Sequence, residues 1–283
     1  TLGLLIPPSI IMIVYGVAAN VSIAKLFIAG VIPGLVLASL FSGYVIIWSL
    51  LNKDKIPAAD ASLTFAQKIY EGRNLIPVVS LIALVLGSIY SGIATATEAA
   101  ALGVAGSLIL SGIERSLNWE TFKSGLFAAC RVYCMIGLIL AGAAFLTMAM
   151  GFIGLPRHLA EFIGGLNLSP VMLILLLIVF FVILGCFLDG ISMVVLTMAV
   201  LLPTVEKAGF DLIWFGIFIV LVVEMAQITP PVGFNLFVLQ GLTKKQLMYL
   251  AKVAFPFFMV MVLMVFMTYY IPDIVLWMPR NMG

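Results

Sequence analysis

Charged side chains are scarce in this chain. Aspartate, glutamate, lysine and arginine together make up 9% of the 283 residues, whereas hydrophobic residues make up 64%. A soluble globular domain is nearer half apolar and about a quarter charged. A water-soluble fold of this size cannot bury so much apolar surface, so lipid must be the solvent for much of the chain. The composition therefore predicts an integral membrane protein.

Other absences exclude whole classes of function. The net charge is only +2, and no basic stretch is interleaved with aromatics, so no nucleic-acid partner is expected. No phosphate-binding G-x-x-x-x-G-K-[ST] loop, G-x-S-x-G elbow or H-E-x-x-H helix is present, so we expect neither ATP hydrolysis by that route nor an enzyme. No motif for an organic cofactor is found either.

Histidine and cysteine are too few for a metal centre. The three cysteines, Cys130, Cys134 and Cys186, lie inside apolar segments, and the single histidine is His158. Structural zinc usually takes four ligands, so the cysteines are expected to be small buried hydrophobes. His158 is expected at the surface of an amphipathic connector.

Long apolar stretches are what the chain has instead. Five uncharged stretches reach the roughly 20 residues that a spanning helix needs: 26–52, 74–97, 132–156, 162–188 and 253–272. Three further apolar segments, 99–113, 190–205 and 212–223, are shorter and suit half-helices or re-entrant hairpins. These lengths predict an all-α polytopic membrane protein.

Two proline pairs interrupt apolar segments near mid-membrane. Proline lacks a backbone donor and clashes with the preceding turn, so each pair should break its helix. Carbonyl groups freed there cannot face lipid and need protein, water or an ion. Each pair is followed at the same spacing by a third proline, which indicates either a repeated transporter half or the tendency of prolines to gather at helix breaks. The two sets are Pro7, Pro8 and Pro33, and Pro230, Pro231 and Pro256.

The predicted organisation has four parts. Residues 1–52 form the end of a first repeat, 53–74 a basic cytoplasmic loop by the positive-inside rule, and 75–124 connecting helices. Residues 125–283 form a second repeat, with a re-entrant hairpin at about 185–205 and an interrupted helix at about 212–241. The chain opens inside a hydrophobic segment without a charged leader, so we expect a fragment of a longer protein rather than a signal peptide.

A few charged residues stand in apolar surroundings. Glu98, Asp189 and Glu224 interrupt long apolar context, and Arg131 lies within one turn of the start of an expected spanning helix. A charge at membrane depth costs a few kcal/mol, so it marks a pathway or a paired partner. For Asp189 and Glu224 we favour a buried structural or coupling role. For Arg131 a position at a helix end in the headgroup region is favoured.

The segment 185–203 predicts a helical hairpin. Its glycines permit a tight turn, which places Asp189, Gly190 and Ser192 near the tip. A helix broken near Thr229 and Asn235 would present carbonyl, hydroxyl and amide oxygens to that tip, a set that suits Na⁺. The alternative is that these hydroxyls bond only to carbonyls of their own helices.

Several motifs in fixed order resemble the large membrane subunit of tripartite ATP-independent periplasmic (TRAP) transporters. They are LLIPPS at 4–9, AGVIPG at 29–34, ATEAAA at 96–101, GCFLDG at 185–190, WFG at 214–216 and ITPPVGFN at 228–235. The resemblance covers essentially the whole chain. It departs from the family in one respect, since the family's large subunit normally carries an earlier half with a first hairpin rich in glycine and serine.

The resemblance implies an elevator-type secondary transporter with inverted repeats and discontinuous helices, located in the bacterial inner membrane. It implies uptake of an organic acid driven by a Na⁺ gradient, together with membrane lipid, a small membrane (Q) subunit and a periplasmic substrate-binding (P) protein as partners. It also implies that the interrupted helices face the ion and the substrate. The expected Na⁺ ligands are then Ser9, Gly190, Ser192, Thr229, Gly233 and Asn235, and the expected substrate or coupling residues are Asp189, Glu224, Arg131, Pro8 and Pro231.

Other readings of the sequence remain open. A stand-alone ion/dicarboxylate symporter of related fold would need no periplasmic partner. An ABC permease domain would share the composition but would need ATP, and the paired broken helices disfavour it. A membrane enzyme lacks its catalytic residues here, and a structural scaffold has no evident use for proline-broken helices.

Overall fold

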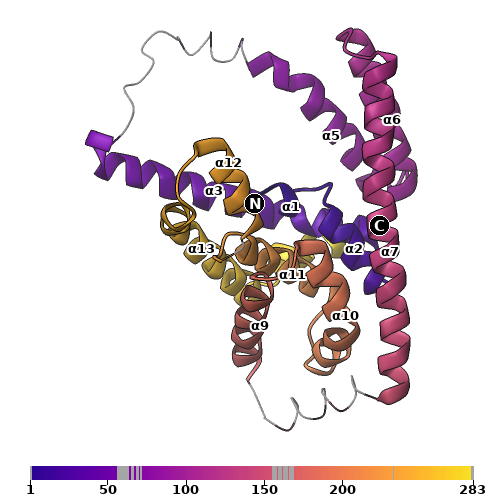
Figure 1. The fold of residues 1–283 in the computed structure, drawn as a ribbon, viewed down its shortest axis with the longest axis vertical. Coiled ribbons are helices and arrows are strands. Elements are labelled where there is room, and N and C mark those ends of the chain that lie inside the picture. The colour runs from indigo at the N-terminus through magenta and orange to yellow at the C-terminus, as the bar shows by residue number, and fades with distance from the viewer. Residues whose placement is uncertain are drawn as a thin grey trace. The chain divides into compact units, whose positions relative to one another are not determined.

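The structure is a computed structural model that describes residues 2–55, 72–154, 169–231 and 233–281, together with 64, 67, 70, 158, 161 and 165. Regular structure within these residues is entirely helical, as the apolar lengths predict (Figure 1). The helices are α1 (Leu2–Leu5), α2 (Ile10–Ala18), α3 (Ile23–Leu51), η1 (Lys53–Lys55), η2 (Arg73–Leu75), α5 (Ile76–Tyr90), α6 (Ala96–Ile113), α7 (Trp119–Ile153), α9 (Pro170–Leu184), α10 (Gly190–Lys207), α11 (Leu212–Gln227), α12 (Phe234–Thr243), α13 (Leu247–Tyr270) and α14 (Asp273–Arg280).

Within the residues that the structure describes, five helices are long and apolar enough to cross a membrane: α3, α6, α7, α10 and α13. The expected spanning helices 74–97 and 162–188 are therefore wrong, because the helices found there, α5 and α9, have only 15 residues each. Local turn chemistry shortens them. A turn and the Thr95–Glu98 capping box separate α5 from α6, and Ser169 caps the start of α9. Conversely α6 and α10, expected to be shorter, each reach 18 residues.

The chain divides into two compact units, one of Thr1–Leu37 with Ala129–Gly283 and one of Ala38–Ala128. In the second unit α5 packs against α6, where Gly106 leaves no room for a Cβ beside Leu81. Glu98, expected as an intramembrane charge, accepts hydrogen bonds from the backbone N–H and the hydroxyl of Thr95, both at 2.8 Å. Its carboxylate therefore caps the first turn of α6.

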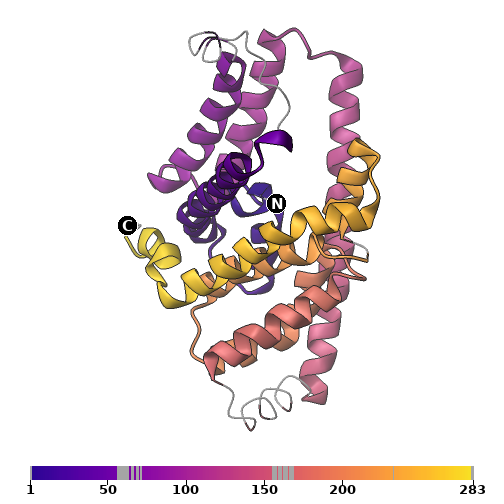
Figure 2. The same cartoon turned by 90° about the vertical axis from the view of Figure 1, so that its left-hand side faces the viewer.

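The core of the first unit is built around α11. Every residue from Trp214 to Gln227 is buried, and α11 contacts α2, α9, α10 and α13 (Figure 2). A helix that is apolar all round belongs in such a position. Two long-range hydrogen bonds hold it there: Tyr15 donates to the Leu212 carbonyl at 2.7 Å, and the Trp214 indole donates to the Thr268 carbonyl at 2.8 Å.

The two proline sets with the same spacing occupy corresponding places in the secondary structure. Pro7 and Pro8 separate α1 from α2, and Pro230 and Pro231 separate α11 from α12. Each broken helix is followed by a long helix with an internal proline, Pro33 in α3 and Pro256 in α13. Both Pro-Pro peptide bonds are cis. That the two halves form inverted repeats stays a prediction.

Several surface expectations need correction or fall outside the described residues. Cys130 and Cys134 are exposed on α7 rather than buried, because little of the protein that the structure describes packs on that part of the helix. Arg131 is not near a helix start, since α7 begins at Trp119. His158 is exposed, as expected. Much of the basic 53–74 loop lies outside the described residues, among them its charged residues Asp60, Lys68 and Glu71.

Candidate functional site at the helix breaks

The first break lies between α1 and α2. Pro7 and Pro8 supply no backbone N–H, so the chain cannot continue the α1 helix through them. Ser9 restarts it, because its hydroxyl accepts a hydrogen bond from the Met12 N–H at 3.4 Å as the cap of α2. The Ser9 side chain is almost wholly buried. Ser9, a predicted Na⁺ ligand, therefore caps α2 and is shielded from solvent.

The second break lies between α11 and α12. The Thr229 hydroxyl donates to the carbonyls of Met225 at 2.9 Å and Ala226 at 2.8 Å, which satisfies part of the α11 C-terminus. A Cβ on Gly233 would lie 2.7 Å from the Thr229 carbonyl oxygen and 2.9 Å from that of Gln227. Only glycine fits here, and two backbone oxygens converge on it.

The turn between α9 and α10 has a different cap. Asp189 accepts hydrogen bonds from the N–H groups of Ile191 at 3.1 Å and Ser192 at 3.3 Å, and the Ser192 hydroxyl donates to the same carboxylate. The acidic cap also complements the positive end of the α10 dipole. The sequence prediction of a turn with these residues at its tip is confirmed. Whether this helix pair is re-entrant stays a prediction.

The tip of this turn meets the second break. Gly185 leaves no space for a Cβ beside Ala226, and the Cys186 thiol donates to the Pro230 carbonyl at 3.5 Å. A Cβ on Gly190 would lie 2.5 Å from the Gln227 amide nitrogen. The turn and the break, distant in sequence, therefore share one contact surface, and small residues permit this close approach.

The first break reaches the same place through α2. The Gly190 position also lies beside Ile11, 3.2 Å from where its Cβ would stand, and Ile11 follows the Ser9 cap by two residues. Helices α2 and α10 pack along each other, and α1 contacts α11. The unit thus brings together two helix breaks and one helix-turn-helix tip.

A buried carboxylate links the two sides of the second break. Glu224, in the last turn of α11, is 2% exposed, and the Asn235 amide in α12 donates to its Oε2 at 3.4 Å. The side chains of the two half-helices therefore touch across the unwound segment. A buried carboxylate costs free energy unless it is paired, and the Asn235 amide supplies one hydrogen bond to it.

Most predicted site residues are in this region. Gly190, Thr229, Gly233, Asn235 and Glu224 lie at or beside the second break. Asp189 and Ser192 form the tip, while Pro8 and Pro231 lie at the breaks themselves and are exposed. Arg131 is different: it is exposed on α7, and no side chain of the described residues forms an ion pair with it. The structure therefore does not bring Arg131 to the breaks.

Gln227 was missed by the sequence analysis. Its side chain is largely buried, and its amide touches the Gly190 position at the centre of the site. The signal was available, since Gln227 is an amide at the end of a helix that is otherwise apolar and immediately precedes the proline break. Cys186 was likewise expected only to be a small buried hydrophobe, although its thiol donates to the Pro230 carbonyl at the break.

The donors at this site are hard oxygen atoms. Backbone carbonyls of Gln227 and Thr229 stand beside Gly233, and hydroxyl, amide and carboxylate oxygens lie nearby. Within the described part of the chain, no three His, Cys, Asp or Glu residues group as transition-metal ligands would. Such a donor set suits an alkali or alkaline-earth cation better than a soft metal.

The apolar helices and the paired helix breaks define a multi-pass membrane protein with the features of a permease. Residues 1–274 match the family model described as the DctM component of the tripartite ATP-independent periplasmic transporters. The chain belongs to this family, which confirms the resemblance seen in its motifs.

Three relatives show how the chain compares with characterised members. It is 32% identical over 284 residues to the C4-dicarboxylate TRAP transporter large permease protein DctM of Pseudomonas aeruginosa, covering 100% of this chain and 66% of that protein. It is 33% identical to the isethionate TRAP transporter permease protein DctMQ of Oleidesulfovibrio alaskensis, covering 96% of this chain and 43% of that protein. It is 34% identical to the ectoine/5-hydroxyectoine TRAP transporter large permease protein UehC of Ruegeria pomeroyi, covering 83% of this chain and 55% of that protein. The chain thus spans at most about two thirds of these relatives.

Proposed function

We propose that this chain is the permease subunit of a Na⁺-coupled secondary transporter that imports an organic acid across the bacterial inner membrane. The observation that carries this proposal is the meeting of two helix breaks with one helix-turn-helix tip inside a single compact unit. Unwound backbone at membrane depth is tolerated only where protein buries it or where it lines a cavity. Paired interrupted helices of this kind are where transporters bind ions and substrates.

Na⁺ is the proposed coupling ion. The carbonyls of Gln227 and Thr229 beside Gly233, and the side-chain oxygen of Asn235 at the same break, offer hard ligands. The Ser192 hydroxyl is proposed to join them from the tip. A hydroxyl that donates its proton to a carbonyl keeps oxygen lone pairs for a cation, so the back-bonded Thr229 remains a suitable ligand. Ser9 and Gly190 complete the proposed set from the adjacent helices.

An organic acid is the proposed substrate. The names of two relatives specify a C4-dicarboxylate and isethionate, which are both anions. The N-terminus of α12 has no side-chain cap and begins at the break, so its positive dipole end is directed at the site. Asp189, Glu224, Pro8 and Pro231 are proposed to shape or couple this region. Arg131 could act on the substrate only after a rearrangement that brings α7 to the breaks.

The proposed partners and motion follow from the family. A small membrane (Q) subunit and a periplasmic (P) protein are proposed, and the name DctMQ of one relative joins the M and Q designations. The helix-turn-helix of α9 and α10 is proposed to act as a re-entrant hairpin that moves with the broken helices in an elevator motion. The close contacts among α2, α10 and α11 favour movement of these helices as one body.

Uptake into proteoliposomes tests this function directly. The complete transporter containing this chain is reconstituted with a Na⁺ gradient as the only energy source, and the binding protein is added or omitted. We expect uptake only with both Na⁺ and the binding protein. Uptake with Na⁺ alone would instead identify a stand-alone symporter, and uptake requiring ATP would identify an ABC permease.

Substitutions at the site should weaken Na⁺ dependence without unfolding the protein. In Asn235→Ala and Ser192→Ala we expect the Na⁺ concentration for half-maximal uptake to rise about tenfold, as for the loss of one interaction with a charged group. Asn52→Ala, just after the end of α3, and Ser107→Ala, at an exposed position on α6, remove the same groups away from the site and serve as controls. Unchanged Na⁺ affinity in both site variants would count against the proposed ligands.

A further inference from the structure

A pocket lies away from the breaks, where the turn between α10 and α11 meets the corner between α13 and α14. Its volume is about 350 Å³, within the range of small-ligand sites. It combines aromatic walls with one cationic and one anionic side chain. The residues that matter are Phe210, Asp211, Trp214, Tyr269 and Arg280.

The aromatic wall is held in place by its own contacts. Phe210 stacks on Trp214 with ring centroids 5.1 Å apart, and Tyr269 lies 6.3 Å from Phe210 and 6.5 Å from Trp214. The hydrogen bond from the Trp214 indole to the Thr268 carbonyl fixes the indole. Trp214 is 4% exposed and stacks on Phe218 as well as on Phe210, so it supports the wall rather than presenting a free face. Phe210 and Tyr269 are then rigid aromatic groups that can contact a ligand at little cost in conformational entropy.

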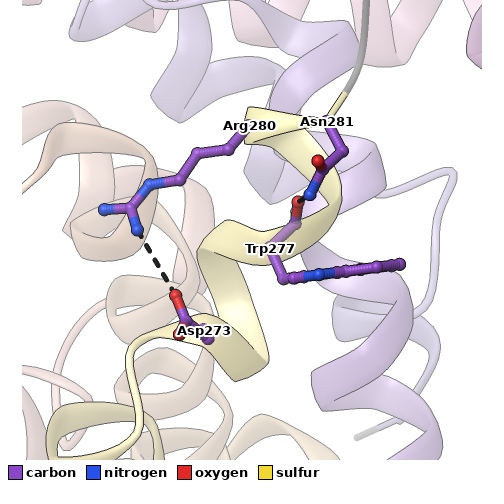
Figure 3. Close-up of polar contacts among 4 residues, drawn as sticks. All are labelled: Asp273, Trp277, Arg280 and Asn281. Atoms are coloured by element: carbon purple, nitrogen blue, oxygen red, sulfur yellow. Dashed lines mark hydrogen bonds and ion pairs between the residues drawn. The ribbon is translucent and has the colours of Figure 1, made fainter.

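The positive group of the pocket is Arg280. Its side chain leaves the end of α14 and turns back to the start of that helix, where Nη1 donates to Asp273 at 3.3 Å, while Trp277 points the other way (Figure 3). The two side chains of this pair are 62% and 70% exposed. An exposed pair of this kind is weak, and the guanidinium keeps further N–H donors for a phosphate.

The negative group is Asp211. Its Oδ1 accepts hydrogen bonds from the N–H groups of Ile213 at 2.7 Å and Trp214 at 3.1 Å, as the cap of α11. Among the described residues, nothing bonds to its Oδ2. Asp211 and Arg280 line the same pocket without forming an ion pair there. The pocket thus offers separate partners for a cation and an anion.

The residues around the pocket are of the types that gather at a membrane-water interface. It adjoins the end of α13, one of the helices able to cross a membrane, where Tyr269 and Tyr270 are adjacent. Trp277 is exposed on the following short helix, whose Val275 and Leu276 are buried. Tyrosine and tryptophan gather at the headgroup level of membrane proteins, with the ring in the apolar phase and the polar atom toward water.

We propose that this pocket binds the headgroup of a zwitterionic phospholipid with a primary ammonium, that is, a phosphatidylethanolamine. Arg280 takes the phosphate, while Asp211, beside the ring of Phe210, takes the ammonium. A purely anionic ligand would be repelled by Asp211, which argues against an organic acid here. A soluble glycerophosphoethanolamine shares the headgroup chemistry, but the neighbouring tyrosine and tryptophan residues favour the lipid.

The bound headgroup would join the start of α11 to α14. Because α11 is the central helix of its unit and ends at the second break, the lipid would stabilise the scaffold of the candidate transport site. The inference does not rest on the proposed transport function, since it concerns lipid binding alone. Failure of either can therefore be told from failure of the other.

Native mass spectrometry of the complete, delipidated transporter containing this chain tests the proposal. We expect phosphatidylethanolamine to bind about tenfold more tightly than phosphatidylglycerol, and Arg280→Gln to lower that affinity about tenfold, the factor for one charge-assisted hydrogen bond. Asp211→Asn keeps a good helix cap and should remove the preference between the two lipids. Lys252→Gln, at the other end of α13, is the matched control and should change nothing.

Two results would overturn the proposal. One is unchanged phosphatidylethanolamine affinity in both Arg280→Gln and Asp211→Asn. The other is soluble glycerophosphoethanolamine binding as tightly as the lipid, which would make the lipid source wrong. A thermal shift provides a second measurement: phosphatidylethanolamine should raise the unfolding temperature of the wild-type protein but not that of Arg280→Gln.

Discussion

Replacing Gly185 with alanine is expected to separate the helix-turn-helix tip from the second break and to abolish most uptake. The new Cβ would overlap that of Ala226 and lie 3.1 Å from its Cα, and α11 is buried on all sides and cannot move away. Overpacking of a core in this way costs about 1–3 kcal/mol. The measurements are the unfolding temperature of the purified transporter and its Na⁺-driven uptake.

A matched pair of variants separates the clash from a general effect of alanine. Gly43→Ala lies in α3 with nothing near its Cβ position, so we expect wild-type uptake and a slight gain in helix stability. The double variant Gly185→Ala with Ala226→Gly removes the overlapping methyl group and should recover part of the loss. Equal uptake by Gly185→Ala and the wild-type protein would show that this contact does not matter for transport.

The second large effect is expected at Glu224. Glu224→Gln keeps the shape and an oxygen that accepts the Asn235 hydrogen bond, but it removes the buried charge. We expect uptake to fall tenfold to about a hundredfold, as for the loss of an interaction with a charged group, while expression and monodispersity are retained. Initial uptake rates at saturating Na⁺ and substrate are the measurement.

The control for this substitution is Glu206→Gln. Glu206 is an exposed glutamate on α10, so removal of its charge should leave uptake unchanged. Glu224→Ala additionally deprives the Asn235 amide of its acceptor and should lower thermal stability as well as uptake. Wild-type uptake by Glu224→Gln would mean that the buried carboxylate has only a structural role.

Sequence patterns succeeded where local chemistry decides the structure. The missing N–H groups of Pro7 and Pro8, and of Pro230 and Pro231, predict the two breaks wherever the surrounding fold places them. The glycines of 185–190 likewise predict the turn that ends α9 before α10. These features depend on a few neighbouring residues, so they could be read directly.

Sequence patterns gave wrong predictions where a turn lies inside an apolar run, and where the burial of a side chain depends on residues far away in the chain. The run 74–97 looked long enough to span a membrane, but the hydrogen bonds of Thr95 and Glu98 start a new helix inside it. Cys130 and Cys134 looked buried because their neighbours are apolar, yet in a membrane protein apolar residues also face outward. Gln227 was overlooked because its contact with the Gly190 position joins segments far apart in the chain.

The sequence by itself determined the membrane setting, the two helix breaks and the family. Composition is a property of the whole chain, and proline breaks and ordered motifs depend only on neighbouring residues. Only the tertiary structure decided which small residues face each other, that Glu224 meets Asn235 across the break, and that Asp211 and Arg280 line one pocket. The physical reason is that such contacts require close approach of separate helices. The close approach is set by packing over the whole unit, and no spacing along the chain records it.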